Sequence, residues 1–546
     1  MVSITGEREK RSPRIRSDAE SHSGHALPMN MMNTNRSATL LTTASLFLLL
    51  MTVTVVVRNQ VFGGVSPHSL LPLSVLTVVI SGALYRVPYD LDARANGYVL
   101  RGVALMLGCY AVLNYPSYSL PDGLPTAHAV ARYMAFASAV MALWRPAFAL
   151  LPILYTTWRK AVDIESTGID VSPTDYMPVL EVGWILLVAF LSIRLVQIVR
   201  VLEPGQKSTL YLWTLIAAIG AHFGNYFYSG VAKLLLDGGA SSWVLENNTA
   251  NIMLASWQAG FLPIAAWPAF AQGVSEVVQD HVVVINALVL AGQLLSVLFI
   301  ARPALIIALT VFYDLMHLTI YALSGIFFWK WIILNLLIIG AVSKLPLQRF
   351  DLPTKVIGVS FTLIGWMFFF TARLGWYDTA SLKDIYVEAV DKRGRVFRVP
   401  SNYYLNSSLT FTQGRLLPYW DGHFSGVDSL GSTKSYSQMK RLGRCDPELV
   451  PRERALDFSS LEGFVLRHHE WGIHHADASG LVHYDRFPHH VWSNPWLFEE
   501  FAQLDKREVA GFRVVVESKC LTWKDGRLSQ QVVSRDQSSG VNTNGQ

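Results

Sequence analysis

The chain has 546 residues, of which 51% are hydrophobic and 16% are charged, and its formal net charge is +5. This composition is too apolar and too poor in charge for an ordinary soluble protein. Basic residues form no block interleaved with aromatic ones, so we do not expect a nucleic-acid partner. The totals predict an integral membrane protein that crosses the lipid bilayer several times.

The chain contains three cysteines, Cys109, Cys445 and Cys520, and no Cys-x-x-Cys pair. Three cysteines cannot form a disulfide framework. Cys445 and Cys520 could pair with each other in the C-terminal region, but we expect two free thiols. The redox compartment stays open.

Residues 1–37 are polar, carry both charges and show no apolar periodicity. We expect a disordered, cytoplasmic leader rather than a cleaved signal peptide, because the first apolar run begins only at Ala38. That run extends to Val57 and is the first predicted spanning helix. The Arg-rich leader favours a cytoplasmic N-terminus by the positive-inside rule.

The membrane domain is predicted over residues 38–375. About 20 apolar residues span the ~30 Å hydrocarbon core, and several of the apolar runs here are interrupted, so we expect about eight to eleven spanning helices. After the first run, they fall at residues 69–85, 98–114, 130–156, 177–198, 208–233, 250–271, 281–301, 303–325, 326–342 and 354–373.

Hydropathy falls and charge rises after Gly375, which predicts a separate soluble domain over residues 376–533. Residues 384–400 alternate as two strands around a turn at Asp391–Gly394, and residues 511–528 show a similar pattern. We therefore expect a small, β-rich α+β domain. Residues 534–546 are predicted to be a disordered tail.

One apolar segment holds a lysine where the bilayer should hold none. Read as a helix, His222, Tyr226, Ser229 and Lys233 follow the spacing i, i+4, i+7, i+11 and form one polar stripe. A lysine at the centre of a spanning helix costs about 2.5–3.5 kcal/mol, which makes Lys233 a candidate functional residue. The alternative is a lysine near the helix end that extends to the interface beside Asp237.

A second polar stripe lies on a later apolar segment. Thr310, Tyr313, His317 and Tyr321 share one helical face, and Asp314 is adjacent. A packing network between helices would explain such a stripe, since each hydrogen bond there is worth about 1 kcal/mol. Two stripes on separate helices, each with a base, favour a shared buried pocket instead.

Both stripes resemble motifs of one family. The segment NYFYSGVAKLLLDGGASSW at residues 225–243 resembles the signature of the vitamin K-dependent gamma-carboxylase superfamily and its bacterial HTTM-domain relatives. In that signature an aromatic-rich helix leads to a lysine, and a tryptophan follows. The segment DLMHLTIYALSGIFFWKWIILN at residues 314–335 resembles the family's later helix, where a histidine precedes a Gly-Ile-Phe stretch.

The resemblance implies that Lys233 is the catalytic base, which in the carboxylases deprotonates reduced vitamin K, and that His317 matches the later-helix histidine. A buried amine suits this role because desolvation disfavours the ammonium form. The cofactor or substrate implied is a lipid-soluble hydroquinone; the residues alone identify none. Seven other residues of the two motifs would bind the substrate: His222, Tyr226, Ser229, Trp243, Tyr313, Asp314 and Tyr321.

One departure counts against glutamate carboxylation as the reaction. The carboxylases carry an Asn-Asn-His element before the lysine, whereas Asn247–Asn248 here follows Lys233 and precedes Thr249. We expect an integral, multi-pass membrane enzyme, in the cell membrane if the source is bacterial. The alternative is a non-enzymatic transporter or accessory subunit in which Lys233 and His317 line a polar path or make interhelical bonds.

Residues 467–490 hold seven of the fifteen histidines, with Glu470, Asp477 and Asp485 nearby. Imidazoles and carboxylates are ligands for zinc, iron and copper. Their spacings match neither His-Glu-x-x-His nor a facial triad, so we expect no catalytic metal. Asn406 and Asn247 also begin glycosylation sequons, which matter only at luminal sites of a eukaryotic protein.

Overall fold

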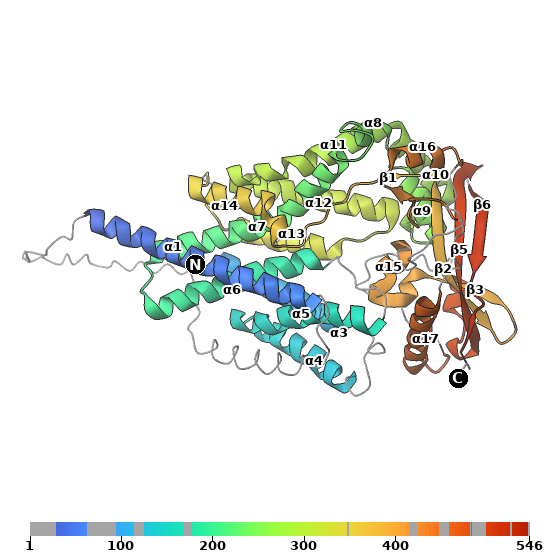
Figure 1. Cartoon of the computed structure of the whole chain (residues 1–546), viewed down its shortest axis with the longest axis horizontal. Helices are drawn as coiled ribbons and strands as arrows, with labels where there is room; N and C mark the ends of the chain where they lie inside the picture. The colour runs from blue at the N-terminus through green and yellow to red at the C-terminus, as the bar shows by residue number, and fades with distance from the viewer. Residues whose placement is uncertain are drawn as a thin grey trace, which may run out of the picture.

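The computed structural model combines a long bundle of helices with a sheet that lies across one end of the bundle (Figure 1). The sheet is built from the last third of the chain and has short helices beside it. The structure describes residues 29–62, 94–113, 125–167, 176–346, 349–413, 423–446, 458–480, 482, 498–524 and 527–543.

The bundle is the apolar part of the molecule. Its long helices are α1 (Met29–Phe62), α3 (Arg94–Leu113), α4 (Pro125–Met141), α5 (Leu150–Thr167), α6 (Met177–Val199), α7 (Pro204–Leu234), α11 (Val282–Leu294), α12 (Pro303–Ser324), α13 (Trp329–Val342) and α14 (Leu352–Leu363). Other helical elements lie between them: η3 (Pro146–Ala149), α8 (Ser242–Glu246), α9 (Asn251–Ala259), η4 (Pro263–Ala266), α10 (Pro268–Asp280), η5 (Leu295–Ala301) and η6 (Gly365–Met367).

Within the described residues, five helical stretches are long and apolar enough to cross a membrane. This number supports a membrane protein and is smaller than the predicted eight to eleven. The run predicted at 69–85 lies outside the described residues. The five stretches are Ala38–Val57, Ala95–Leu113, Met177–Val199, Val282–Ala301 and Pro303–Ser324, and the shorter apolar helices are Trp329–Val342 and Leu352–Leu363.

Three predicted spans are not single helices. Residues 130–156 divide between α4 and α5, with η3 between them, and residues 250–271 divide among α9, η4 and α10. Residues 354–373 begin in α14 but continue, after η6, as an extended segment. Proline begins η3, η4 and α10, where its fixed φ starts a new helix and its missing N–H prevents continuation of the old one.

Local signals fix the ends of the two helices that carry the polar stripes. α7 begins with a capping box between Glu203 and Gln206 and has proline at its first position. α12 ends at Gly325, whose φ of 68° lies in the left-handed region. A Cβ there would lie 1.8 Å from the carbonyl oxygen of Phe261, so only glycine fits.

The sheet is antiparallel throughout, with strand order β3-β2-β5-β6 and a short fifth strand, β7, paired with β5. Both predicted hairpins are present. The predicted disordered tail is wrong from residue 534 to residue 542, where the chain completes one strand and forms another. The strands are β2 (Ser381–Asp391), β3 (Val396–Val399), β5 (Val509–Lys524), β6 (Arg527–Gln537) and β7 (Val541–Asn542), and a separate pair joins β1 (Tyr377–Asp378) to β4 (Ser432–Thr433).

The two faces of this sheet differ in chemistry, as the period of two along each strand requires. On one face Ile385 and Val387 pack in an apolar core with residues of α17 (Ser459–His474). On the other face Lys519 is buried and forms ion pairs with Asp384 at 3.0 Å and Glu517 at 2.7 Å. The small helical elements of this region are η7 (Ser401–Ser407), α15 (Ser408–Gln413), α16 (Tyr436–Leu442), α18 (Glu499–Ala502) and η9 (Lys506–Glu508).

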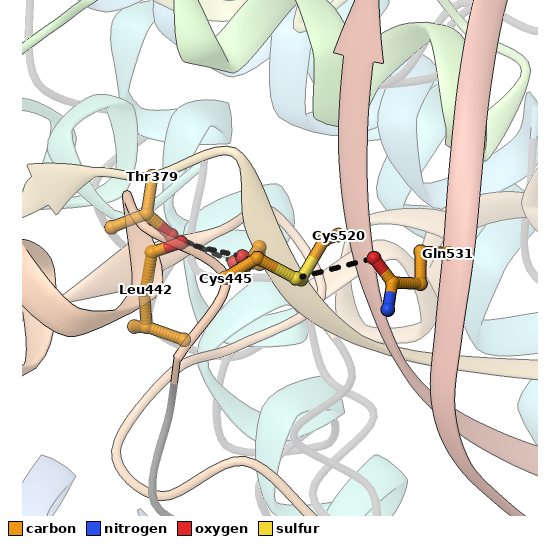
Figure 2. The surroundings of a disulfide bond; sticks show 6 residues. Thr379, Leu442, Cys445, Cys520 and Gln531 are labelled. Carbon is orange, nitrogen blue, oxygen red and sulfur yellow. Dashed lines mark hydrogen bonds between the residues drawn. A yellow bond between two sulfur atoms is a disulfide. The ribbon is translucent and has the colours of Figure 1, made fainter.

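A disulfide joins Cys445 to Cys520 (Figure 2). The expectation of two free thiols is therefore wrong: β5 holds Cys520 beside the segment that follows α16, with the two Cα atoms 5.9 Å apart. The bond lies beside Gln531 of β6. It closes a loop of 75 residues within the C-terminal region.

Candidate functional site at the end of α7

The polar stripe of α7 faces protein. His222, Tyr226, Ser229 and Lys233 are all buried, and Lys233 is 7% exposed. Asp237, which the alternative of a lysine at the interface would place beside Lys233, accepts from the backbone N–H of Tyr436. The stripe then divides into two groups with different partners.

The first group contains His222 and Tyr226, which meet α12 and α13 through Asn335. The Asn335 side-chain oxygen lies 2.9 Å from His222 Nε2, and its amide nitrogen donates to Tyr226 Oη at 3.2 Å and Asp314 Oδ1 at 2.7 Å. Because an amide oxygen only accepts, the histidine proton lies on Nε2. Sequence reasoning missed Asn335, which lies on α13 within a run of Ile and Leu residues.

Aromatic contacts complete this group. Tyr226 stacks on Tyr313 with ring centroids 3.7 Å apart, and His317 stacks on Phe328 at 5.0 Å. Tyr226 also lies 5.8 Å from His317 between centroids. The structure thus brings the two predicted stripes together. We call this set the α7–α12–α13 cluster: His222, Tyr226, Tyr313, Asp314, His317 and Asn335.

The second group surrounds Lys233. Its Nζ donates to the carbonyl oxygens of Leu374 and, at 3.3 Å, Ser229. It also lies 4.9 Å from the centre of the Trp243 ring, within the range of a cation–π contact. The Trp243 indole donates to the carbonyl of Trp376 at 2.9 Å, which brings two chain segments onto the lysine.

Lys233 and the α7–α12–α13 cluster occupy different levels of the bundle. Seven residues separate Tyr226 from Lys233, or about 10 Å along the axis at ~1.5 Å per residue. Tyr321, predicted to bind substrate with them, contacts Phe327, with ring centroids 4.8 Å apart. The predicted residues of α7 therefore lie at two levels of the bundle.

Asp378, which sequence reasoning missed, is the carboxylate on which the charge of Lys233 acts, without a direct ion pair between the two side chains. It is buried in β1, and its oxygens accept from Asn247 Nδ2 at 2.9 Å and from the Trp376 indole at 3.1 Å. Burial raises the pKa of Asp378 to about 6, while these hydrogen bonds and the charge of Lys233 oppose the rise. Its only sequence signal is its position just after the predicted domain boundary.

Asn247 closes the site from the other side. Its side-chain oxygen accepts from the backbone N–H of Asp378 at 2.6 Å, and its carbonyl accepts from Asn286 of α11 at 2.9 Å. It is completely buried. The sequon that begins at Asn247 is therefore inaccessible to glycosylation in the folded protein; the side chain of Asn406 lies outside the described residues.

The same face of α7 satisfies the extended segment that follows α14. The backbone N–H of Ala372 donates to Asn225 Oδ1 at 2.8 Å, and that of Leu374 donates to Ser229 Oγ at 3.3 Å. Glu181 of α6 accepts from the N–H of Phe370 at 3.0 Å. The backbone of this segment has no intrahelical hydrogen bonds, and lipid would offer it none. It therefore needs side-chain acceptors such as these.

The histidine-rich segment is only partly described. His468 and His469 are buried on α17, and burial lowers their pKa values to about 3 and about 4. His468 Nε2 lies 2.6 Å from the carbonyl oxygen of Tyr403, and His475 Nδ1 lies 2.8 Å from that of Trp471. No group of three or more potential ligands is placed to hold a metal among the described residues. His483, His489 and His490 lie outside them.

A buried histidine outside that segment was not anticipated. His423 Nδ1 lies 3.0 Å from Ser518 Oγ and 3.1 Å from Ser534 Oγ, and its Nε2 lies 3.1 Å from Asp536 Oδ2. Ser518 is fully buried and also accepts from the backbone N–H of Phe424. This arrangement fastens residues 423–424 onto β5 and β6.

In comparisons with protein-family models, curated proteins and solved structures, the chain has no match. The resemblance to the carboxylase superfamily thus rests on the two sequence motifs alone.

Proposed function

We propose that this chain is a multi-pass integral membrane enzyme in which Lys233 is the base that removes a proton from a lipid-soluble or membrane-presented substrate. The observation that carries the proposal is a lysine buried at the end of α7, with the Trp243 ring beside its amine and a second buried ionisable group, Asp378, close enough for its charge to act on it. Two buried ionisable groups are costly to maintain for stability alone, which favours a functional role.

The chemistry follows from the two groups. The neutral Lys233 amine accepts the substrate proton, and the Asp378 carboxylate stabilises the ammonium that forms. The Asn247 amide and the Trp376 indole donate to the carboxylate and hold it in place. A hydroquinone, the substrate class that the motif resemblance implies, is acidic enough and apolar enough to suit both the base and the bilayer.

The α7–α12–α13 cluster has a supporting role in this proposal. Its imidazoles, tyrosines and Asp314 line the interior of the bundle one level away from Lys233. We therefore assign His317 to substrate orientation and not to the proton transfer.

A second candidate is a non-enzymatic membrane component, and one observation favours it. Lys233, Ser229 and Asn225 all hydrogen-bond the backbone of residues 372–374. In that case Lys233 holds the bundle against the segment that leads to the sheet, and it takes no part in a reaction.

Extraction of the purified protein separates the two candidates. Mass spectrometry of the organic extract from detergent-solubilised protein should find one quinone or quinol per chain, above the level in a control membrane protein purified identically. The proposal also requires that this compound be consumed or converted by wild-type protein and not by Lys233→Met. A protein without any stoichiometric isoprenoid or aromatic compound, in which Lys233→Met fully complements a deletion strain, would support the fastening role instead.

A further inference from the structure

Helix α10 has three distinct faces. Ala271, Ser275 and Val278 form its buried face, where Ser275 Oγ accepts from the Trp523 indole of β5 at 3.2 Å. Glu276 and Gln279 lie on an exposed polar face. The third face is apolar and is left uncovered by the described residues.

The uncovered apolar face is a stripe and not a set of scattered residues. Trp267, at the N-cap, is 63% exposed, Phe270 is 59% exposed and Val277 is 60% exposed, and Val274 between them is half-buried. Their spacing of i, i+3, i+7 and i+10 places all four on one side of the helix. Large exposed apolar side chains aligned in this way mark a surface that meets another apolar phase.

The stripe continues into the outer surface of the bundle. Only His281 separates α10 from α11, and the first turns of α11 present exposed Val283, Val284 and Leu288. The apolar stretch Val282–Ala301 is only 28% buried within the protein, as expected of a helix that faces lipid. The apolar face of α10 therefore begins where the lipid-facing surface ends.

We propose that α10 lies in the plane of the membrane interface, on the side of the sheet, with Trp267, Phe270 and Val277 inserted at the boundary between headgroups and acyl chains. The partner is the lipid surface. Tryptophan is the residue typical of this depth, and amphipathic helices bind there by apolar burial. This inference rests on the membrane part of the proposed function and is independent of any role of Lys233 in proton transfer.

The charge of α10 specifies the kind of lipid surface. The helix contains Glu276 and Asp280 and no lysine or arginine. Attraction to anionic headgroups requires basic residues, each worth about 1 kcal/mol near a charged surface. Binding is therefore driven by the apolar stripe, and a zwitterionic bilayer is sufficient.

The proposed position of α10 also predicts how deep in the membrane the Lys233 site lies. Asn286, which donates to the carbonyls of Trp243 and Asn247, follows Asp280 by six residues. Six residues of helix span about 9 Å. The Lys233 site thus lies just below the interface, where a substrate with a polar head and an apolar tail would present its head.

Site-directed spin labelling of the full-length protein tests the proposal. Single cysteines replace Phe270 or Val277 on the stripe, and Glu276 or Gln279 on the polar face as matched controls. All four are made in a Cys109→Ser background that keeps the native disulfide. The proteins are reconstituted in phosphatidylcholine vesicles, and collision rates are measured with oxygen, which concentrates in lipid, and with a water-soluble nickel chelate.

We expect the ratio of oxygen to nickel collisions to be at least threefold higher at positions 270 and 277 than at 276 and 279, with no change on addition of phosphatidylglycerol. Equal ratios at all four positions would show that the stripe faces water and would overturn the proposal. Exclusion of both reagents from 270 and 277 would show a protein partner, such as a second copy of the chain, and would also overturn it. Neither failure would affect the outcome of the Lys233→Met experiment.

Discussion

At the scale of single residues, Lys233 makes two kinds of interaction: one depends on the length of its side chain, and the other depends on its charge. Its hydrogen bonds go to main-chain carbonyls, which any donor of the right length could satisfy. The interaction with buried Asp378 is specific to its charge. Substitutions that keep one feature and remove the other are therefore informative.

We predict that Lys233→Met leaves membrane insertion intact and abolishes turnover, because an apolar side chain of similar length fills the site but accepts no proton. Lys233→Arg should also be inactive, since guanidinium stays protonated and cannot act as a base. His317→Ala should reduce activity less than either. Turnover, or complementation of a deletion strain at matched membrane abundance, measures all three. Full activity of Lys233→Met would contradict the proposed function.

The raised pKa of Asp378 predicts how the stability of the protein depends on pH. Its pKa is raised to about 6 in the folded protein, above the ordinary value of 3.8. Between these values the unfolded chain loses the proton while the folded chain keeps it, so this group lowers the stability as pH rises from about 4 to about 6, and its contribution is constant above that window. Asp378→Asn should remove this component.

Thermal unfolding of wild type and Asp378→Asn in the same detergent, at several pH values from 4 to 7, measures the difference. Asp391→Asn is a suitable control, because hydrogen bonds and the charge of Arg395 lower the pKa of that carboxyl despite an opposing effect of burial. The assignment fails if the stability difference between wild type and Asp378→Asn is the same at pH 4 and pH 7.

At the scale of elements, α7 and the extended segment after α14 depend on each other. The backbone of α7 makes its hydrogen bonds within the helix and needs no side chains for this. Residues 370–374 are not helical, and their backbone N–H groups donate instead to the side chains of Asn225, Ser229 and Glu181. The cost of polar side chains in the bundle is offset by the backbone groups that they satisfy.

We predict that Asn225→Ala destabilises the protein by about 1–3 kcal/mol, because the N–H of Ala372 would be buried without an acceptor. Ser229→Ala should act in the same direction through Leu374. Thr209→Ala, on the same helix, is the matched control, since its exposed hydroxyl donates only to the carbonyl of Gly205. Unfolding in detergent and protease cleavage near residue 375 report the effect. Equal stability of Asn225→Ala and Thr209→Ala would show that this contact contributes nothing.

At the scale of the whole molecule, the Cys445–Cys520 disulfide favours one side of the membrane for the sheet. Disulfides persist in oxidising compartments and are rare in the cytosol. The absence of basic residues from α10 agrees with this side, because the cytoplasmic leaflet is the anionic one. With a cytoplasmic N-terminus, as the Arg-rich leader predicts, the chain must cross the bilayer an odd number of times.

We therefore predict that the C-terminal region is extracytoplasmic and that its disulfide is oxidised in cells. A cysteine introduced at exposed Lys434 should react with a membrane-impermeant maleimide in intact cells. Alkylation before and after reduction should show one thiol, Cys109, without reductant and three with it. Reaction at position 434 only after permeabilisation, or three free thiols at the outset, would place the sheet in the cytosol.

The sequence alone determined the features that depend on local pattern. Apolar length predicted the helices α3, α6 and α12, which are long and apolar enough to cross a membrane, because a helix in lipid satisfies its own backbone. Alternation and turn residues predicted both hairpins of the sheet. Helical spacing placed His222, Tyr226, Ser229 and Lys233 on one buried face.

Only the tertiary structure decided which residues meet across the chain. Asp378 and Asn335 are polar residues that no sequence pattern singled out, and they become site residues because β1 and α13 bring them near α7. The pairing of Cys445 with Cys520 depends on the register of β5 against its neighbours, which composition does not encode. The two levels of the predicted site residues have the same cause. Helical spacing shows which residues share a face, but the residues that pack against that face come from distant segments.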